Sequence, residues 1–173
     1  MFRTKLTRVF QIVLLSGMLR SHIEIASAQS TGGGQAQIVE GRAFIVRQGE
    51  EMEIDSYPMD FKDQDLIQTF DKGKVHLTLK GGDVIFLAPK TEIQFEEKLE
   101  TKGLAKIINR TLKLKGRLLA RIQRNLETQI QIRTPNAIVG VKGTEFVVEF
   151  LSKATNVGTL KGIIVGPINE TMC

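Results

Sequence analysis

Two glutamates occupy matching places in the chain and could act as a pair of catalytic carboxylates. Glu92 and Glu145 each follow a threonine, Thr91 and Thr144, in segments that share the order apolar run, turn, Thr-Glu and alternating apolar residues. Stacking of these segments could bring the carboxyl groups to the separation of about 5–9 Å that glycoside hydrolysis uses. Both glutamates fall on the polar face of an expected strand, however, and the chain has no Trp to form a sugar platform. We therefore favour a non-catalytic role.

Histidine and cysteine supply no other catalytic or metal-binding set. After residue 28 the only histidine is His76, which we expect to be exposed on the outer face of a strand. The only cysteine is the last residue, Cys173, which could form a disulfide between two chains but none within one. One His without a Cys cluster or a nucleophile elbow does not match zinc sites or Ser-His-Asp hydrolases. We expect no enzyme, no cofactor and no metal.

Residues 1–28 have the pattern of an export signal. A basic start precedes an apolar run at residues 9–19, and a small-x-small cleavage site ends at Ala28. We expect cleavage after Ala28 and location in the periplasm or cell envelope. The alternative is an uncleaved membrane anchor, although this apolar run is shorter than the roughly 20 residues that span a bilayer.

Basic residues concentrate between Lys98 and Arg124, where Glu100 is the only acid. Four of them alternate with apolar residues and predict the outer face of a strand: Lys113, Lys115, Arg117 and Arg121. One interpretation is a solvated face that is balanced by the acids Glu50, Glu51, Glu53, Asp55, Asp60, Asp63 and Asp65. The other is a docking face for an acidic partner or an anionic envelope polymer. Nucleic acid is not expected, because interleaved aromatic residues are missing.

Alternation of apolar and polar residues predicts an all-β domain. Strands are expected at residues 37–47 with a bulge or kink at Gly41, at 75–79, 84–88 and 93–96, as a strand pair from 112 to 122, and at 126–134, 146–150 and 157–165. The run at 84–88 is apolar throughout, which predicts a central strand buried on both faces. The acidic segment 48–65 should be loop with one short strand. Residues 99–110 are ambiguous, because lysines at four-residue spacing allow one short helix that Gly103 would weaken.

These elements predict one domain behind a leader. The expected boundaries are a signal peptide with its helix at 1–28, a flexible Gly-rich spacer at 29–35, a β domain at 36–166 and a short tail at 167–173. Short Leu-Lys-Gly echoes recur at uneven spacing. We expect the domain to be an irregular β-solenoid-like structure or a stacked β-sheet.

Several blocks of the chain resemble those of a FecR domain. The blocks are residues 67–95, 112–118, 134–148 and 157–165. The most specific block contains the family-motif residues Thr134, Pro135, Gly140, Gly143, Thr144 and Phe146. Gln64 stands where the family usually has a glycine before the aspartate at Asp65, so we expect a reshaped turn there. The resemblance implies a periplasmic, β-rich module that binds other proteins and performs no chemistry.

Three functional interpretations follow. The first is a secreted or periplasmic FecR-like module that binds an unidentified envelope protein. The second is a degenerate transmembrane signalling regulator of the sigma-factor relay type, anchored by its leader. The third is a binder of anionic envelope polysaccharide through the four basic residues on the predicted strand face.

Overall fold

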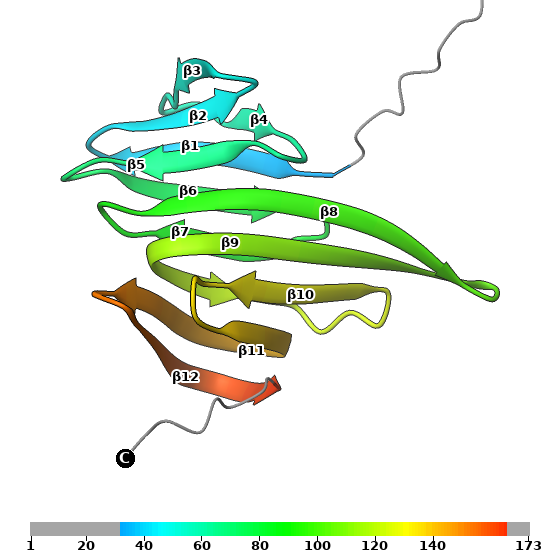
Figure 1. Cartoon of the computed structure of the whole chain (residues 1–173). Coiled ribbons are helices and arrows are strands. Elements are labelled where there is room, and N and C mark those ends of the chain that lie inside the picture. Colours follow the sequence, from blue (N-terminus) through cyan, green and yellow to red (C-terminus); the bar gives the residue numbers. More distant parts are fainter. Residues whose placement is uncertain (1–31, 166–173) are drawn as a thin grey trace, which may run out of the picture.

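The computed structural model describes residues 32–165, which form twelve β-strands and no helix (Figure 1). The strands are β1 (Gly34–Glu40), β2 (Ala43–Arg47), β3 (Glu50–Glu53), β4 (Met59–Phe61), β5 (Leu66–Thr69), β6 (Lys74–Leu79), β7 (Val84–Leu87), β8 (Glu92–Lys102), β9 (Ala105–Arg121), β10 (Thr128–Arg133), β11 (Ile138–Leu151) and β12 (Ala154–Val165). The prediction of an all-β domain is confirmed.

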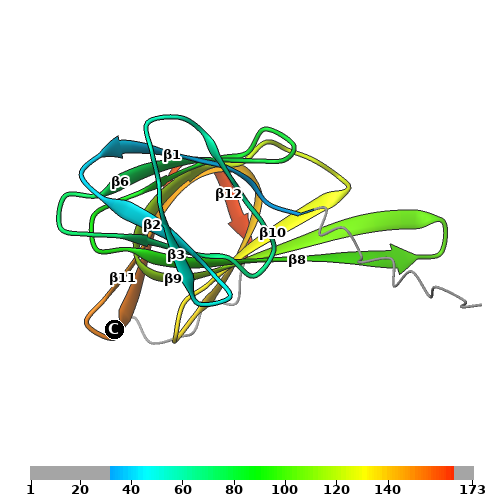
Figure 2. The same cartoon turned by 90° about the horizontal axis from the view of Figure 1, so that it is seen from above.

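The twelve strands form one sheet that curls back on itself (Figures 1 and 2). One half of the sheet has the order β3-β2-β5-β8, and the other half has the order β7-β6-β1-β4. Strand β9 joins the halves, because residues 105–115 pair with β8 and residues 118–121 pair with β7. Beyond β9, β11 pairs with β9 and β12 pairs with β11, while β10 runs parallel to β9. The topology is a curled, mostly antiparallel sheet, and it does not show the successive coils of a β-solenoid.

Strand β9 turns from one half of the sheet to the other at Gly116. Gly116 has φ +108°, a conformation that residues with side chains rarely adopt. A Cβ atom at this position would lie 2.6 Å from Oγ1 of Thr91. That buried hydroxyl accepts a hydrogen bond from the Arg117 N–H at 3.0 Å and donates to the Arg117 carbonyl at 3.1 Å. Glycine and threonine together therefore fix the corner of the sheet.

The hydrophobic core fills the inside of the curl. Its largest fully buried side chains are Phe61, Phe95, Phe146, Ile45, Ile67, Leu77, Leu79, Ile85, Leu87, Ile93, Leu112 and Leu114. Phe61 of β4 meets Phe95 of β8 edge-on, with ring centroids 5.4 Å apart, so the two halves of the sheet share one core. Burial of each such side chain contributes about 1.5–3 kcal/mol. The curl is thus held mainly by apolar packing.

The glycines at the start of the described chain are not a flexible spacer. Strand β1 begins at Gly34, inside the segment 29–35 that we expected to be spacer, and residues 32–34 are buried. A Cβ atom on Gly34 would lie 2.0 Å from the Thr78 carbonyl oxygen, and one on Gly33 would lie 1.9 Å from that of Phe61. The glycines allow β1 to approach β4 and β6 closely. The spacer prediction was therefore wrong for residues 32–35.

The apolar run at residues 84–88 is central but is buried on one face only. It forms β7, which lies between β9 and β6. Ile85 and Leu87 face the core, whereas Phe86 is 42% exposed. Burial on both faces was wrongly expected, because this sheet is a single layer around its core and its outer face meets solvent.

Residues 98–110 belong to a long hairpin rather than a helix. Lys102 of β8 pairs with Ala105 of β9, and Gly103 turns the chain with φ +64°. Residues 98–107, which we call the arm, extend beyond the body of the sheet (Figure 2). The four-residue spacing of the lysines was a misleading helix signal, since cross-strand pairing with β9 decides the structure.

The number of strands in the acidic segment and the turn at Gln64 also differ from expectation. The acidic segment 48–65 holds two strands, β3 and β4, instead of one. Gln64 has φ +68°, and its N–H donates to the Phe95 carbonyl at 2.8 Å. The turn before Asp65 thus takes a conformation that glycine adopts readily, although glutamine occupies the position.

The predicted signal peptide at 1–28 and the tail at 167–173 with Cys173 lie outside the described residues. In the described part of the chain we find no helix capable of spanning a bilayer.

Candidate functional site

The four basic residues of the predicted docking face lie on the outer face of β9, and each is paired with a glutamate. Lys113 contacts Glu96 at 2.5 Å and Lys115 contacts Glu92 at 3.3 Å, both across to β8. Arg121 contacts Glu145 of β11 at 3.2 Å. Arg117 of β9 pairs with Glu149, which also belongs to β11. We call this row of four pairs the ion-pair ladder.

The ion-pair ladder balances the charge of the outer face locally. Four cations meet four carboxylates, so little positive potential remains to attract an acidic partner or an anionic polymer. The balancing acids come from β8 and β11 and not from residues 50–65, where we expected them. Exposed pairs of this kind contribute only about 0.2–1 kcal/mol each to stability. The docking role of these four residues stays a prediction.

The structure does not bring Glu92 and Glu145 together as a carboxylate pair. Glu92 lies opposite Lys115 and Glu145 lies opposite Arg121, on different neighbours of β9. The two register positions are six residues apart along β9, up to about 20 Å of extended strand. Each carboxylate is held by a cation, so neither geometry nor charge suits acid–base catalysis of glycoside hydrolysis.

His76 is half-buried and not exposed as expected. Its ring stacks on Phe86 of the neighbouring strand, with centroids 4.7 Å apart and an interplanar angle of 8°. This cover buries Nε2, which has no hydrogen-bond partner among the described residues. The part of the chain that the structure describes also contains no group of His, Cys, Asp and Glu suited to hold a metal ion.

The family-motif residues lie in the β10–β11 turn and in β11 itself. The Thr134 hydroxyl is buried, accepts the Ala137 N–H at 3.1 Å and lies 2.7 Å from the Thr155 hydroxyl. The Asn136 amide donates to the Lys153 carbonyl at 2.8 Å, which ties the β10–β11 turn to the β11–β12 turn.

The rest of the motif lies in β11, after the turn at Pro135. Gly143 has φ +61° at a register shift between β11 and β12, and Phe146 is fully buried in the core. Gly140 pairs with Gln131 of β10. The structure thus gives Thr134, Gly143 and Phe146 a structural role.

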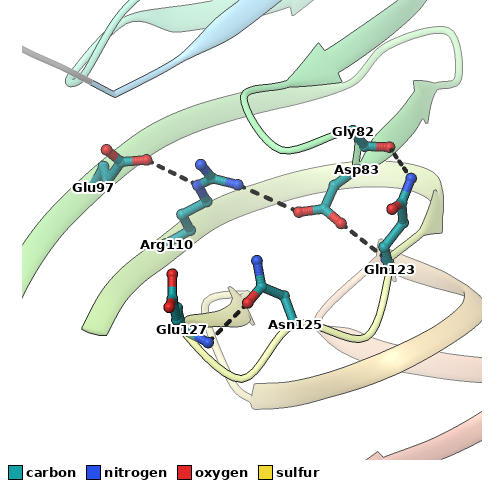
Figure 3. Close-up of polar contacts among 7 residues, drawn as sticks. All are labelled: Gly82, Asp83, Glu97, Arg110, Gln123, Asn125 and Glu127. Carbon is teal, nitrogen blue, oxygen red and sulfur yellow. Dashed lines mark hydrogen bonds and ion pairs between the residues drawn. The ribbon is translucent and has the colours of Figure 1, made fainter. Parts of the chain in front are cut away.

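Sequence reasoning missed a buried ion cluster between β8, β9 and the turn before β7 (Figure 3). Arg110 is 4% exposed and donates through Nε to Glu97 at 2.8 Å and through an Nη atom to Asp83 at 3.3 Å. Asp83 also accepts the Gln123 N–H at 2.9 Å. The available signal was the alternation of β9, which places Arg110 on the inner face with Leu112 and Leu114.

The cluster borders a hollow of about 310 Å³ that Asn125 and Thr128 also line. Burial raises the pKa of the Asp83 carboxyl, although the Gln123 N–H and Arg110 act in the lowering direction. Because Arg110 is already bonded to two carboxylates, the cluster is arranged to hold β7, β8 and β9 together. It offers no free charge of the kind that selects a ligand.

The edges of the sheet differ from one another. The edge strands β3 and β4 have four and three residues, and they carry Glu50, Glu51, Glu53 and Asp60. Strand β12 has twelve residues, of which only Lys161 is charged, and it pairs with β11 alone among the described strands. Short length and charge are the usual protections of an exposed edge against pairing with another chain. The β12 edge is long and carries a single charge, at Lys161.

The arm is the second unpartnered feature. Leu99 and Leu104 are exposed on it, and Leu104 at the turn is completely open to solvent. Lys98 and Lys106 are also exposed, and neither makes an ion pair within residues 32–165. The arm therefore differs from the ion-pair ladder, where every cation is matched.

Comparisons with known proteins agree with the resemblance seen in the sequence. The model of the family described as FecR protein matches residues 65–165. Strands β1–β4 precede this match but belong to the same sheet. No curated protein matches the chain.

One solved structure is similar to the chain. It is a protein described as a candidate anti-sigma factor from Parabacteroides distasonis, with 18% identity and a TM-score of 0.41. The alignment covers 59% of this chain and 51% of that one, so the chain spans about half the length of this relative. The family match extends over more than half of the residues, and the chain belongs to the FecR protein family.

Proposed function

We propose that the chain is a non-catalytic protein-binding module of the bacterial cell envelope, and that its partner adds a β-strand to the β12 edge. The observation that carries this proposal is the long, nearly uncharged edge of β12. Strand addition gives affinity through main-chain hydrogen bonds and specificity through alternate side chains. The export pattern of residues 1–28 supports the envelope location.

The core is incompletely covered next to the β12 edge. Val157 lies opposite the fully buried Val148 but is 42% exposed itself, and Leu151 and Leu160 are also exposed. An added strand would cover part of this apolar surface as well as the free backbone groups. Both gains favour an extended partner segment with apolar residues on one face.

A second candidate is regulation of signalling, with the leader as a membrane anchor. Membership of the FecR family favours it, because the family resemblance implies a relay from the envelope to a cytoplasmic sigma factor. Mass spectrometry of the N-terminus separates the candidates. A chain that starts at Gln29 in the soluble envelope fraction contradicts the anchored regulator, whereas an intact Met1 in the membrane fraction supports it.

Polysaccharide binding through the β9 face has less support, because all four of its cations are engaged in the ion-pair ladder. If it occurs, substitution of the four residues by Ser removes binding at low salt.

Site-specific photo-crosslinking in the producing cell tests the protein-binding proposal. A photoreactive residue is placed at Asn156 or Leu160 on β12, and the matched control is Glu51 on the β3 edge, which is also exposed. We expect a discrete adduct with another protein from the β12 positions and not from Glu51. Equal adducts from both edges, or adducts with a second copy of the chain alone, contradict the proposal.

A further inference from the structure

We propose that the arm, residues 98–107, docks on an anionic membrane surface with Leu104 inserted between lipid headgroups. The arm consists of two strands that pair only with each other, because β10 first joins β9 at Ile108. It projects from the curled sheet, and no other described strand pairs with it (Figure 2). An isolated two-stranded hairpin is at best marginally stable in water, so contact with another surface would stabilise the arm.

The apolar residues of the arm suit a lipid surface. Leu104 follows the turn glycine Gly103 and has no described neighbour to cover its side chain. Leu99 lies opposite Ile108 further back along the hairpin and is also exposed. A single apolar tip on a narrow projection can enter a fluid interface, whereas a protein partner would require a matching pocket.

The charges of the arm favour anionic lipid. The sequence has three lysines in this segment, Lys98, Lys102 and Lys106, against Glu100 alone. Lysines near an anionic leaflet are attracted to its negative surface potential. Each cation of the ion-pair ladder is matched by a glutamate, whereas Lys98 and Lys106 have no such partner among the described residues.

The dimensions of the arm fit interfacial insertion. Lys106 is two residues behind Leu104, about 7 Å along an extended strand. Interfacial segments bury their apolar groups about 5–10 Å into the boundary between headgroups and acyl chains. With Leu104 at that depth, the Lys106 ammonium group lies at the level of the lipid phosphates. Docking through the arm leaves the β12 edge free for a protein partner.

The chain contains no Trp, so one introduced Trp reports on the environment of the arm. In the mature protein purified from cells, Leu104→Trp should shift its emission to shorter wavelength when phosphatidylglycerol vesicles are added. Phosphatidylcholine vesicles should cause little change. The control is Leu126→Trp, at an exposed leucine outside the arm, whose emission should not change with either vesicle. Unchanged emission from Leu104→Trp at low salt overturns the proposal.

Vesicle co-sedimentation tests the same proposal without a new aromatic residue. Leu104→Ser and the double change Lys98→Ser with Lys106→Ser should each weaken binding to phosphatidylglycerol vesicles about tenfold or more. Leu126→Ser should leave binding unchanged. Full binding by the arm variants overturns the proposal. The proposal is also overturned if the parent protein does not bind vesicles and an arm variant loses the photo-crosslinked protein adduct. The arm would then bind protein. The crosslinks from β12 report separately on the function proposed above.

Discussion

Strand β9 carries charged side chains on both faces, and the two faces use them differently. On the inner face, Arg110 is buried and bonded to Glu97 and Asp83. On the outer face, the ion-pair ladder pairs four cations with four glutamates near solvent. Loss of a partner inside leaves a charge without water, whereas water replaces a lost partner outside. Burial, and not the number of ion pairs, therefore decides how much each charge contributes to stability.

The largest difference between the faces should appear on removal of Arg110. Arg110→Ala leaves two carboxylates unpaired in the interior and should lower the free energy of unfolding by about 3–5 kcal/mol. Urea denaturation followed by circular dichroism measures this loss. Arg117→Ala on the outer face is the control. A loss below about 1 kcal/mol for Arg110→Ala would show that the inner cluster behaves like a surface pair.

At the corner formed by Gly116, β9 changes its pairing partner from β8 to β7. This glycine should therefore be the next most sensitive position. Gly116→Ala forces a side chain into a positive φ and against Thr91, and it should cost about 1–3 kcal/mol of stability. The matched control is Gly158→Ala on β12, where an added Cβ has no atom within 4 Å. The same denaturation measurement applies. Equal effects at the two glycines would contradict the role assigned to the corner.

Protonation of Asp83 on the inner face should make the stability of the protein depend on pH. Burial raises the pKa of this carboxyl in the folded protein above its usual value of 3.8. The folded state therefore binds the proton more tightly than the unfolded state. The resulting stability is present below pH 3.8 and is lost as the pH rises through the folded pKa.

Asp83→Asn removes this titration and keeps an oxygen acceptor for the Gln123 N–H. The stability of the variant relative to the parent should increase between about pH 3 and pH 7. Denaturation curves across this range test the sign of the change. A relative stability that falls over the same range would mean that Arg110 stabilises the ionised carboxylate more than burial penalises it.

The smallest effects are expected on the outer face. Arg121→Ser or Lys115→Ser should cost about 0.2–1 kcal/mol, and the cost should shrink further in high salt, which screens exposed charges. Thermal melting at two salt concentrations is sufficient. A salt-independent loss above about 2 kcal/mol would contradict the exposure-based account.

Alternation along the sequence predicted the outer-face residues of β9 correctly, because period-2 patterning is a local property of a strand. The prediction of one strand at residues 37–47 with a kink at Gly41 was wrong. Gly41, with φ +69°, lies between β1 and β2, which belong to different halves of the sheet. The glutamate partners of the four cations could not be predicted, because Glu92 and Glu149 come into register only through the pairing of β8 and β11 with β9. Arg110 breaks the apolar inner pattern, but only the fold identifies Asp83 and Glu97 as its partners.

Other errors arose where tertiary structure overrides local pattern. Residues 98–107 could form a helix by lysine spacing, yet pairing across Gly103 makes them a hairpin. The glycines before residue 35 have the composition of a linker but allow close packing against β4 and β6. The β12 edge could not be recognised from composition, because an edge strand is defined by which strands fail to pair with it.

We proposed that this FecR family member binds a protein partner through the β12 edge. One measurement tests this proposal: the photoreactive residue at Asn156 is combined with the change Leu160→Lys, which places a second charge beside Lys161 on the edge. We predict that the protein adduct seen with Leu160 intact disappears, while the melting temperature of the variant is unchanged. An adduct of undiminished yield from a folded Leu160→Lys variant would contradict the claim.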